Sequence, residues 1–280
     1  MAKLTFNTKA ELFKHLKDNK DALIAEKKFN VKKADSINYH VPVASKDDAS
    51  KSINDILNNV DLETIKAEVV INTTNILDSH GDVHIPGIWK KSLSEKKSLY
   101  LLQEHQMKFD SIITDKTTAL TKSISWKDLG FPNFKGNTEA LIFNCEIDSD
   151  RNKYMFEQYL KGYVKNHSVG MRYVNLFMCI NSEEKYYREE KDNWDKYIYQ
   201  VANSQDAIDN GYFWAVTEAK IIEGSAVVMG SNYVTPTMSV TQTTNVEADN
   251  ITSGKSEPSK DTQEQKQKTK KENLIKFLNN

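Results

Sequence analysis

Apolar side chains recur with a helical period in the first part of the chain. Thr8 and Glu11 have the spacing of a capping box at the start of a segment in which apolar residues lie among lysines. A second stretch carries apolar residues at the spacing i, i+3, i+4, i+7, which puts them on one helix face: Ile53, Ile56, Leu57 and Val60. We therefore predict a helical N-terminal extension over residues 1–66.

The pattern then changes to short apolar and β-branched runs separated by turns, which predict strands of one sheet or barrel. Clear runs occupy residues 68–72, 98–102, 140–143 and 226–229. Helical patterns interrupt them at residues 86–97, which open on a proline, and at residues 151–161. The predicted fold class is α+β, with strands dominating the core of a domain over residues 67–235.

Two segments differ in composition from this domain. Residues 181–211 are rich in charged and aromatic side chains and are interpreted as an insertion between strands. Residues 236–280 become rich in Thr, Lys, Gln and Ser, and residues 255–272 contain no aliphatic or aromatic side chain. We predict a disordered tail there, ending in a short apolar cluster at residues 274–278.

Charge and cysteine content narrow the functional classes. The chain has 38 Lys and Arg against 39 Asp and Glu, a net charge of −1, which does not favour binding to nucleic acid or to an anionic membrane. It has no signal-peptide-like start and no run approaching the ~20 apolar residues that cross a bilayer. Cys145 and Cys179 lie in apolar surroundings, as core thiols in a reducing compartment do. We expect a soluble protein made in the cytoplasm.

Ser168 and His105 are the candidate nucleophile and base. A serine hydroxyl becomes a useful nucleophile only when an imidazole takes its proton. His167 is a poor base for Ser168, because neighbouring residues in a strand point to opposite faces. His105, at the end of an apolar run, can lie on a neighbouring strand. The alternative is an ordinary strand serine and a polar residue at a strand end.

A third group is needed to orient the imidazole, and a carboxylate does this well. Glu223 interrupts an apolar run, and a carboxylate in a buried strand needs a partner to offset its desolvation. Glu218 lies in a more polar stretch, which favours a solvated position. We choose Glu223, with Glu218 as the alternative third member.

A rival metal site lies in residues 78–84. Asp78, His80, Asp82 and His84 alternate, so that an extended strand would point all four side chains one way. Gly81 makes a continuous strand doubtful, and an Asp- and Gly-containing turn explains the same residues. A metal-dependent hydrolase using His80, Asp82 and His84 remains an alternative.

Four motifs in this order resemble the prohead maturation protease family of tailed phages, related to herpesvirus assemblin. The first resembles an element with the pattern D..GD…PGAF, the second a strand ending in the catalytic histidine, the third the nucleophile strand and the fourth the closing strand with its glutamate. These motifs lie at residues 78–89, 101–105, 166–171 and 219–228. The chain departs from the family pattern at Gln106, Met171, Gly224 and residues 230–233.

The resemblance implies a β-barrel-like serine protease with flanking helices. Ser168 would be the nucleophile, His105 the general base and then acid, and Glu223 the orienting carboxylate, with peptide hydrolysis through an acyl-enzyme. Gly170 and Arg172 would support the oxyanion, with a surface salt bridge as the alternative role for Arg172. No cofactor and no bound metal are expected.

Such enzymes act in the host cytoplasm inside the assembling viral prohead. The resemblance therefore implies the major capsid protein and the scaffold as substrates, self-processing, and dimerisation as one means of activation. The other alternative is a non-enzymatic capsid scaffold or assembly protein, in which the helical extension and the apolar end bind partners.

Overall fold

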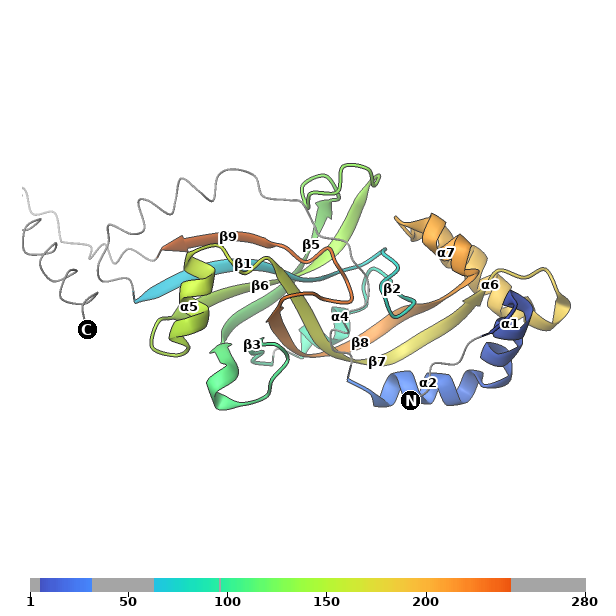
Figure 1. Cartoon of the computed structure of the whole chain (residues 1–280), viewed down its shortest axis with the longest axis horizontal. Coiled ribbons are helices and arrows are strands. Elements are labelled where there is room, and N and C mark those ends of the chain that lie inside the picture. Colours follow the sequence, from blue (N-terminus) through green and yellow to red (C-terminus); the bar gives the residue numbers. More distant parts are fainter. Residues whose placement is uncertain (1–5, 32–62, 96, 243–280) are drawn as a thin grey trace, which may run out of the picture.

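The structure, a computed structural model, describes residues 6–31, 63–95 and 97–242, and its strands form two sheets (Figure 1). The strands are β1 (Thr64–Thr73), β2 (Asp82–His84), β3 (Leu101–Gln103), β4 (Ile112–Thr114), β5 (Lys116–Ser125), β6 (Asn137–Asp148), β7 (Asn166–Ile180), β8 (Tyr212–Val227) and β9 (Thr237–Gln242). The α-helices are α1 (Lys9–Asp18), α2 (Lys20–Phe29), α4 (Lys90–Ser94), α5 (Lys153–Leu160), α6 (Arg188–Tyr197) and α7 (Ser204–Asn210). Single 3-10 turns are η1 (Phe109–Ser111), η2 (Lys185–Tyr187) and η3 (Ile198–Gln200).

The first sheet has the strand order β5-β6-β1-β9, and neighbouring strands in it run antiparallel. Its inner strand β1 is buried on both faces, since Val69 and Ile71 belong to the main core and Val70 to a second cluster with Trp126 and Leu129. This explains why the sequence there is a continuous apolar run rather than an alternation.

The second sheet is organised by β8, which is paired along both of its edges. On one edge β7 runs antiparallel from Asn166 opposite Val227 to Ile180 opposite Tyr212. On the other edge two short strands run parallel to β8, β2 beside residues 214–216 and β3 beside residues 224–226. β4 continues the sheet beyond β3.

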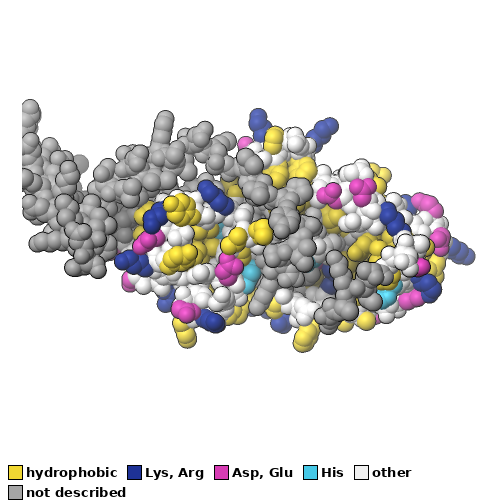
Figure 2. Space-filling model, viewed as in Figure 1, with side chains coloured by type: hydrophobic (Ala, Val, Ile, Leu, Met, Phe, Trp, Pro, Cys, Tyr) yellow, Lys and Arg dark blue, Asp and Glu magenta, His cyan; other side chains and the backbone are white. Residues whose placement is uncertain are grey.

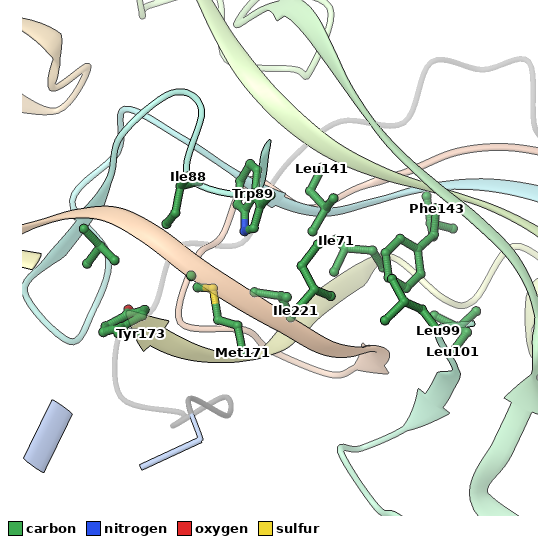
Figure 3. Packing of buried hydrophobic residues seen from close by; sticks show 14 of the residues in the cluster. Ile71, Ile88, Trp89, Leu99, Leu101, Leu141, Phe143, Met171, Tyr173 and Ile221 are labelled. Carbon is green, nitrogen blue, oxygen red and sulfur yellow. The ribbon is translucent and has the colours of Figure 1, made fainter. Parts of the chain in front are cut away.

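The main core lies between the two sheets. Figure 3 shows Ile71, Leu141 and Phe143 of the first sheet packed against Met171 and Ile221 of the second. The α+β class is therefore confirmed, but the strands described here form two open sheets and no closed barrel. The expectation of a barrel-like core is wrong in this respect, because the two sheets bury their inner faces against each other and share none of the described strands.

Two predicted helices are tested by the structure. Helix α5 lies inside the range predicted at residues 151–161, and the side chain of Asn152 accepts a hydrogen bond from the Met155 N–H at its start. The helix predicted at residues 86–97 is shorter, because Gly87 has a φ of 89°, which ends helical backbone there, and α4 begins only at Lys90. The helix predicted at residues 53–60 lies outside the described residues. The tail predicted over residues 236–280 is wrong at its start, because β9 pairs with β1 there, and its remainder beyond residue 242 lies outside the described residues.

Ion pairs hold the N-terminal helices against the domain. The capping box is present, with Thr8 Oγ1 accepting from the Glu11 N–H at 3.2 Å. Lys17 and Lys20 of α1 and α2 bind the fully buried carboxylate of Glu190 in α6, each at 2.7 Å. The predicted extension thus rests on the predicted insertion at residues 181–211, which is helical.

Charges of both signs share the surface. On the face shown in Figure 2, basic and acidic side chains are interspersed between apolar patches. Within the described ranges, none of the helices has both the length and the apolar character to cross a membrane. Cys145 and Cys179 are both buried free thiols, and burial raises the pKa of each well above its ordinary value.

Candidate active site

Glu223 lies at the centre of a buried hydrogen-bonded cluster on β8. Its side chain is 3% exposed. Oε1 is 2.7 Å from His105 Nδ1, and Oε2 accepts a hydrogen bond of 2.6 Å from Ser225 Oγ. Residues 223 and 225 share a face of the strand, since side chains alternate. Both carboxylate oxygens are therefore satisfied within the protein.

His105 reaches this carboxylate through an unusual turn after β3. Glu104 and His105 both have positive φ, 53° and 55°, which is uncommon for residues other than glycine. The Glu104 N–H donates to the Ala226 carbonyl at 3.0 Å, and the His105 N–H donates to Ser225 Oγ at 3.1 Å. The parallel pairing of β3 with residues 224–226 brings the chain to this point, and the turn directs the ring back over β8.

The hydrogen bond to Glu223 determines the state of the imidazole ring. An ionised carboxylate can only accept, so in the neutral ring Nδ1 carries the proton and Nε2 presents a lone pair. Nε2 is buried and has no hydrogen-bond partner among the described residues. A buried acceptor without a partner is costly in a folded protein and calls for an explanation. This is the atom that a general base requires.

Ser168 faces the same cluster from β7. It lies directly opposite Ser225 in the antiparallel pair, so the two side chains are on one face of the sheet. The side chain is nearly buried, at 7% exposed, and a Cβ atom added at Gly230 would lie 3.6 Å from the Ser168 Cβ. No hydrogen bond joins Ser168 Oγ to the His105 ring in this structure. Catalytic hydrogen bonds are often long before substrate binds.

His167, next to Ser168, belongs to a separate buried network. Its Nε2 is 2.9 Å from the Tyr159 hydroxyl and its Nδ1 is 3.1 Å from the Thr235 carbonyl. Since a carbonyl only accepts, Nδ1 carries the proton and Nε2 accepts from Tyr159. Burial lowers the pKa of His167 to about 4. The prediction that His167 points away from Ser168 is confirmed.

The other sequence candidates lie at the edge of this cluster or outside it. Glu218 is partly exposed and forms an ion pair with Lys91 at 3.1 Å, so Glu223 is the carboxylate that meets His105. Arg172 is exposed, opposite Lys220, and forms no ion pair with a described residue. No described contact holds its guanidinium at Ser168.

Gly170 is opposite Glu223 and lacks a side chain for a steric reason. A Cβ atom at this position would overlap Glu223 Oε1. The glycine therefore leaves the space in which the carboxylate turns toward His105. This spatial role is separate from the oxyanion support predicted for Gly170.

The predicted metal ligands do not all converge. Asp78, His80 and Asp82 can bring one ligand atom each within 4.8 Å of one another, but His84 is not in this group. Asp82 is fully buried and already binds a cation, because Lys27 Nζ lies 2.5 Å from its Oδ1. Asp78 Oδ1 accepts from the N–H groups of His80 and Asp82, as in an Asx turn. These residues fit the turn interpretation better than the metal site.

Sequence reasoning missed Ser225 and Asn232. Ser225 joins Glu223 to the His105 backbone. The Asn232 amide donates to the Thr73 carbonyl at 2.9 Å, and its side-chain oxygen accepts from the Val234 N–H at 2.9 Å, which fixes the loop that passes Ser168. A serine two residues after Glu223 on a strand was the available signal for the first, and nothing local indicates the second.

Comparison with known proteins adds no relative: no family model, curated protein or solved structure matches the chain.

Proposed function

We propose that the chain is a serine endopeptidase in which Ser168 is the nucleophile, His105 the general base and acid, and Glu223 the orienting carboxylate. One observation carries the proposal: a buried histidine is held by a buried carboxylate through Nδ1 while its Nε2 has no partner among the described residues. A histidine with a purely structural role has both nitrogens satisfied, as His167 does.

Acylation would begin at Nε2 of His105. This nitrogen takes the proton of Ser168 as Oγ attacks the peptide carbonyl, and the buried Glu223 carboxylate stabilises the imidazolium that forms. The imidazolium then gives its proton to the leaving amine as the C–N bond breaks. Ser168 and His105 both adjoin Ser225, Ser168 as its partner across the strand pair and His105 through its backbone N–H.

Deacylation would use the same groups in reverse order. Nε2 takes a proton from water, the hydroxide attacks the acyl carbon, and the proton returns to Ser168 Oγ as the acid product leaves. The donors for the oxyanion would be backbone N–H groups close to Ser168.

The biological substrates follow from the sequence motifs alone. Their resemblance to prohead maturation proteases favours the major capsid protein and the scaffold as substrates, with self-processing, inside the assembling prohead. The order of the motifs supports this assignment, since residues 101–105, 166–171 and 219–228 each contribute to one cluster.

Labelling with diisopropyl fluorophosphate, followed by mass spectrometry, tests the proposal. The protein should gain one phosphoryl adduct, located on Ser168 by peptide mapping. Purified protein should also cleave itself or a denatured capsid protein, and Ser168→Ala should lower either rate by at least about a thousandfold.

Ser123→Ala is the matched control, because Ser123 is an exposed serine on β5. It should label and cleave like the wild type. Undiminished cleavage by a folded Ser168→Ala variant, or an adduct on another serine, would refute the assignment.

A further inference from the structure

We infer that Ser225 is a positioning residue that holds the Glu223 carboxylate and the His105 ring in their working arrangement. The inference rests on the proposed function and adds to it a fourth group that touches neither substrate nor the reacting atoms. Ser225 is fully buried, so its hydroxyl is not available as a nucleophile.

The hydroxyl of Ser225 makes two hydrogen bonds of opposite direction. Oγ–H donates to Glu223 Oε2 at 2.6 Å, and Oγ accepts from the His105 N–H at 3.1 Å. A hydroxyl is the smallest side-chain group that donates and accepts at one atom. It therefore ties the carboxylate and the histidine backbone to a common point on β8.

The two hydrogen bonds fix different degrees of freedom. The bond to Oε2 sets the rotation of the carboxylate, so that Oε1 points at Nδ1. The bond from the His105 N–H anchors a backbone that has a φ of 55°. Left-handed backbone at a non-glycine residue persists only where surrounding contacts determine it. Loss of the hydroxyl should release both the carboxylate and the turn.

The contacts on the opposite side of Glu223 show why one more hydrogen bond is needed. The carboxylate fills the space beside Gly170, because a side chain there would overlap Oε1. The His105 ring and the Ser225 hydroxyl are the partners found for this carboxylate. Without the Ser225 hydroxyl, the His105 ring is the one hydrogen-bond partner left for this carboxylate among the described residues.

Two variants test the inference: Ser225→Ala removes the hydroxyl, and Ser225→Thr keeps it. The rate of Ser168 labelling by diisopropyl fluorophosphate should fall by about tenfold to a hundredfold in Ser225→Ala, as activity does when the hydrogen-bond partners that orient metal ligands are removed. Ser225→Thr should recover most of the rate. Thr138→Val is the control, because it also removes a buried, hydrogen-bonded hydroxyl but in the other sheet. It should label at the wild-type rate.

Nitrogen-15 NMR of the His105 ring provides a readout that does not depend on activity. At a pH at which the ring is neutral, the wild type should be in the Nδ1–H form, and Ser225→Ala should show a measurable share of the Nε2–H form. If the wild type does not react with the reagent, the proposed function fails, and the ring form alone decides the role of Ser225.

The wild-type protein gives a further measurement in case Ser225→Ala does not fold. The His105 amide should exchange with deuterium as slowly as amides of β8, since its hydrogen bond is internal. Rapid exchange of that amide, or a folded Ser225→Ala variant with wild-type labelling and ring form, would overturn the inference.

Discussion

Two short strands on the same edge of β8 each position a histidine. The two histidines differ in whether both ring nitrogens have a hydrogen-bond partner. His84 ends β2, and His105 follows β3 by two residues. Nε2 of His84 is 3.0 Å from the Tyr173 hydroxyl, and its Nδ1 is 3.3 Å from Asn72 Oδ1. His105 has a carboxylate on Nδ1 and no partner for Nε2 among the described residues.

The comparison shows that the more conspicuous motif is the structural one. Residues 78–84 combine two aspartates and two histidines, yet Asp82 is neutralised by Lys27 and accepts from the Tyr173 hydroxyl at 2.8 Å. The cluster around His105 uses one histidine, one glutamate and one serine from distant segments. A buried group whose hydrogen bonds are incomplete, rather than a dense motif, indicates where a reaction can take place.

The largest expected effect separates the two histidines. His105→Gln should lower the rate of hydrolysis by at least about a thousandfold, because it removes the proposed general base. His84→Gln should retain hydrolysis. Its free energy of unfolding should fall by about 1–3 kcal/mol, so that it unfolds at a lower denaturant concentration, because the substitution disturbs buried hydrogen bonds. Cleavage assays and urea unfolding measure both. Equal losses of activity in the two folded variants would contradict the division of roles.

Loss of the ion pair between Lys27 and Asp82 should have the next largest effect. Lys27→Met removes the ammonium from the fully buried Asp82 carboxylate, which should cost about 3–5 kcal/mol of stability. Lys14→Met is the control, because the Lys14–Asp18 pair is exposed, and it should not change the melting temperature measurably. Thermal unfolding measures both, and similar melting temperatures would show that the α2 contact contributes no stability.

The pH dependence of stability should reflect His167, which is fully buried. The folded-state pKa of about 4 lies below the ordinary value of 6.5, so the unfolded chain binds more protons between these values. Stability from this group is therefore complete above pH 6.5 and is lost as the pH falls toward 4, by about 3 kcal/mol.

Urea unfolding at several pH values tests this window. His167→Gln, which removes the titrating group, should show a correspondingly flatter profile between pH 6.5 and 4. A profile identical to that of the wild type would assign the acid sensitivity to other groups.

The smallest effect concerns the departure from the family pattern at Gly224. A Cβ atom there would lie 2.7 Å from Phe143 Cε2 and 2.9 Å from Ile71 Cδ1, so the first sheet excludes the usual aliphatic side chain. Gly224→Ala should destabilise the protein by about 1–3 kcal/mol through overpacking. Denaturant unfolding provides the measurement, and Ala226→Gly controls for the effect of glycine on the strand. A neutral Gly224→Ala variant would show that the two sheets move apart easily.

Local patterns predicted the parts of the fold that are set by neighbours in sequence. The capping box at Thr8, the helix at residues 153–160 and the apolar strand runs are present because propensity, capping and period act over a few residues. The shortened helix after Pro86 follows from backbone geometry at Gly87, which a periodicity argument does not weigh.

Long-range pairing accounts for what the sequence did not predict. The contact of Lys17 with Glu190 joins residues 173 positions apart, and neither residue has a local signal for it. Glu223 was chosen correctly as the partner of His105, because a carboxylate in an apolar run has to meet a partner. Ser225 was missed since a serine in a strand is common, and only the β3 pairing shows what its hydroxyl contacts.

The dual edge pairing of β8 has a consequence for the order in which the site forms. Ser168 and His105 emerge from the ribosome well before Glu223 and Ser225, and β3 has no edge of β8 to pair with until residues 224–226 have been made. A nascent or truncated chain that ends before these residues would hold a serine and a histidine but no scaffold that joins them. The cluster of Ser168, His105 and Glu223 can therefore assemble only after β8 has been completed.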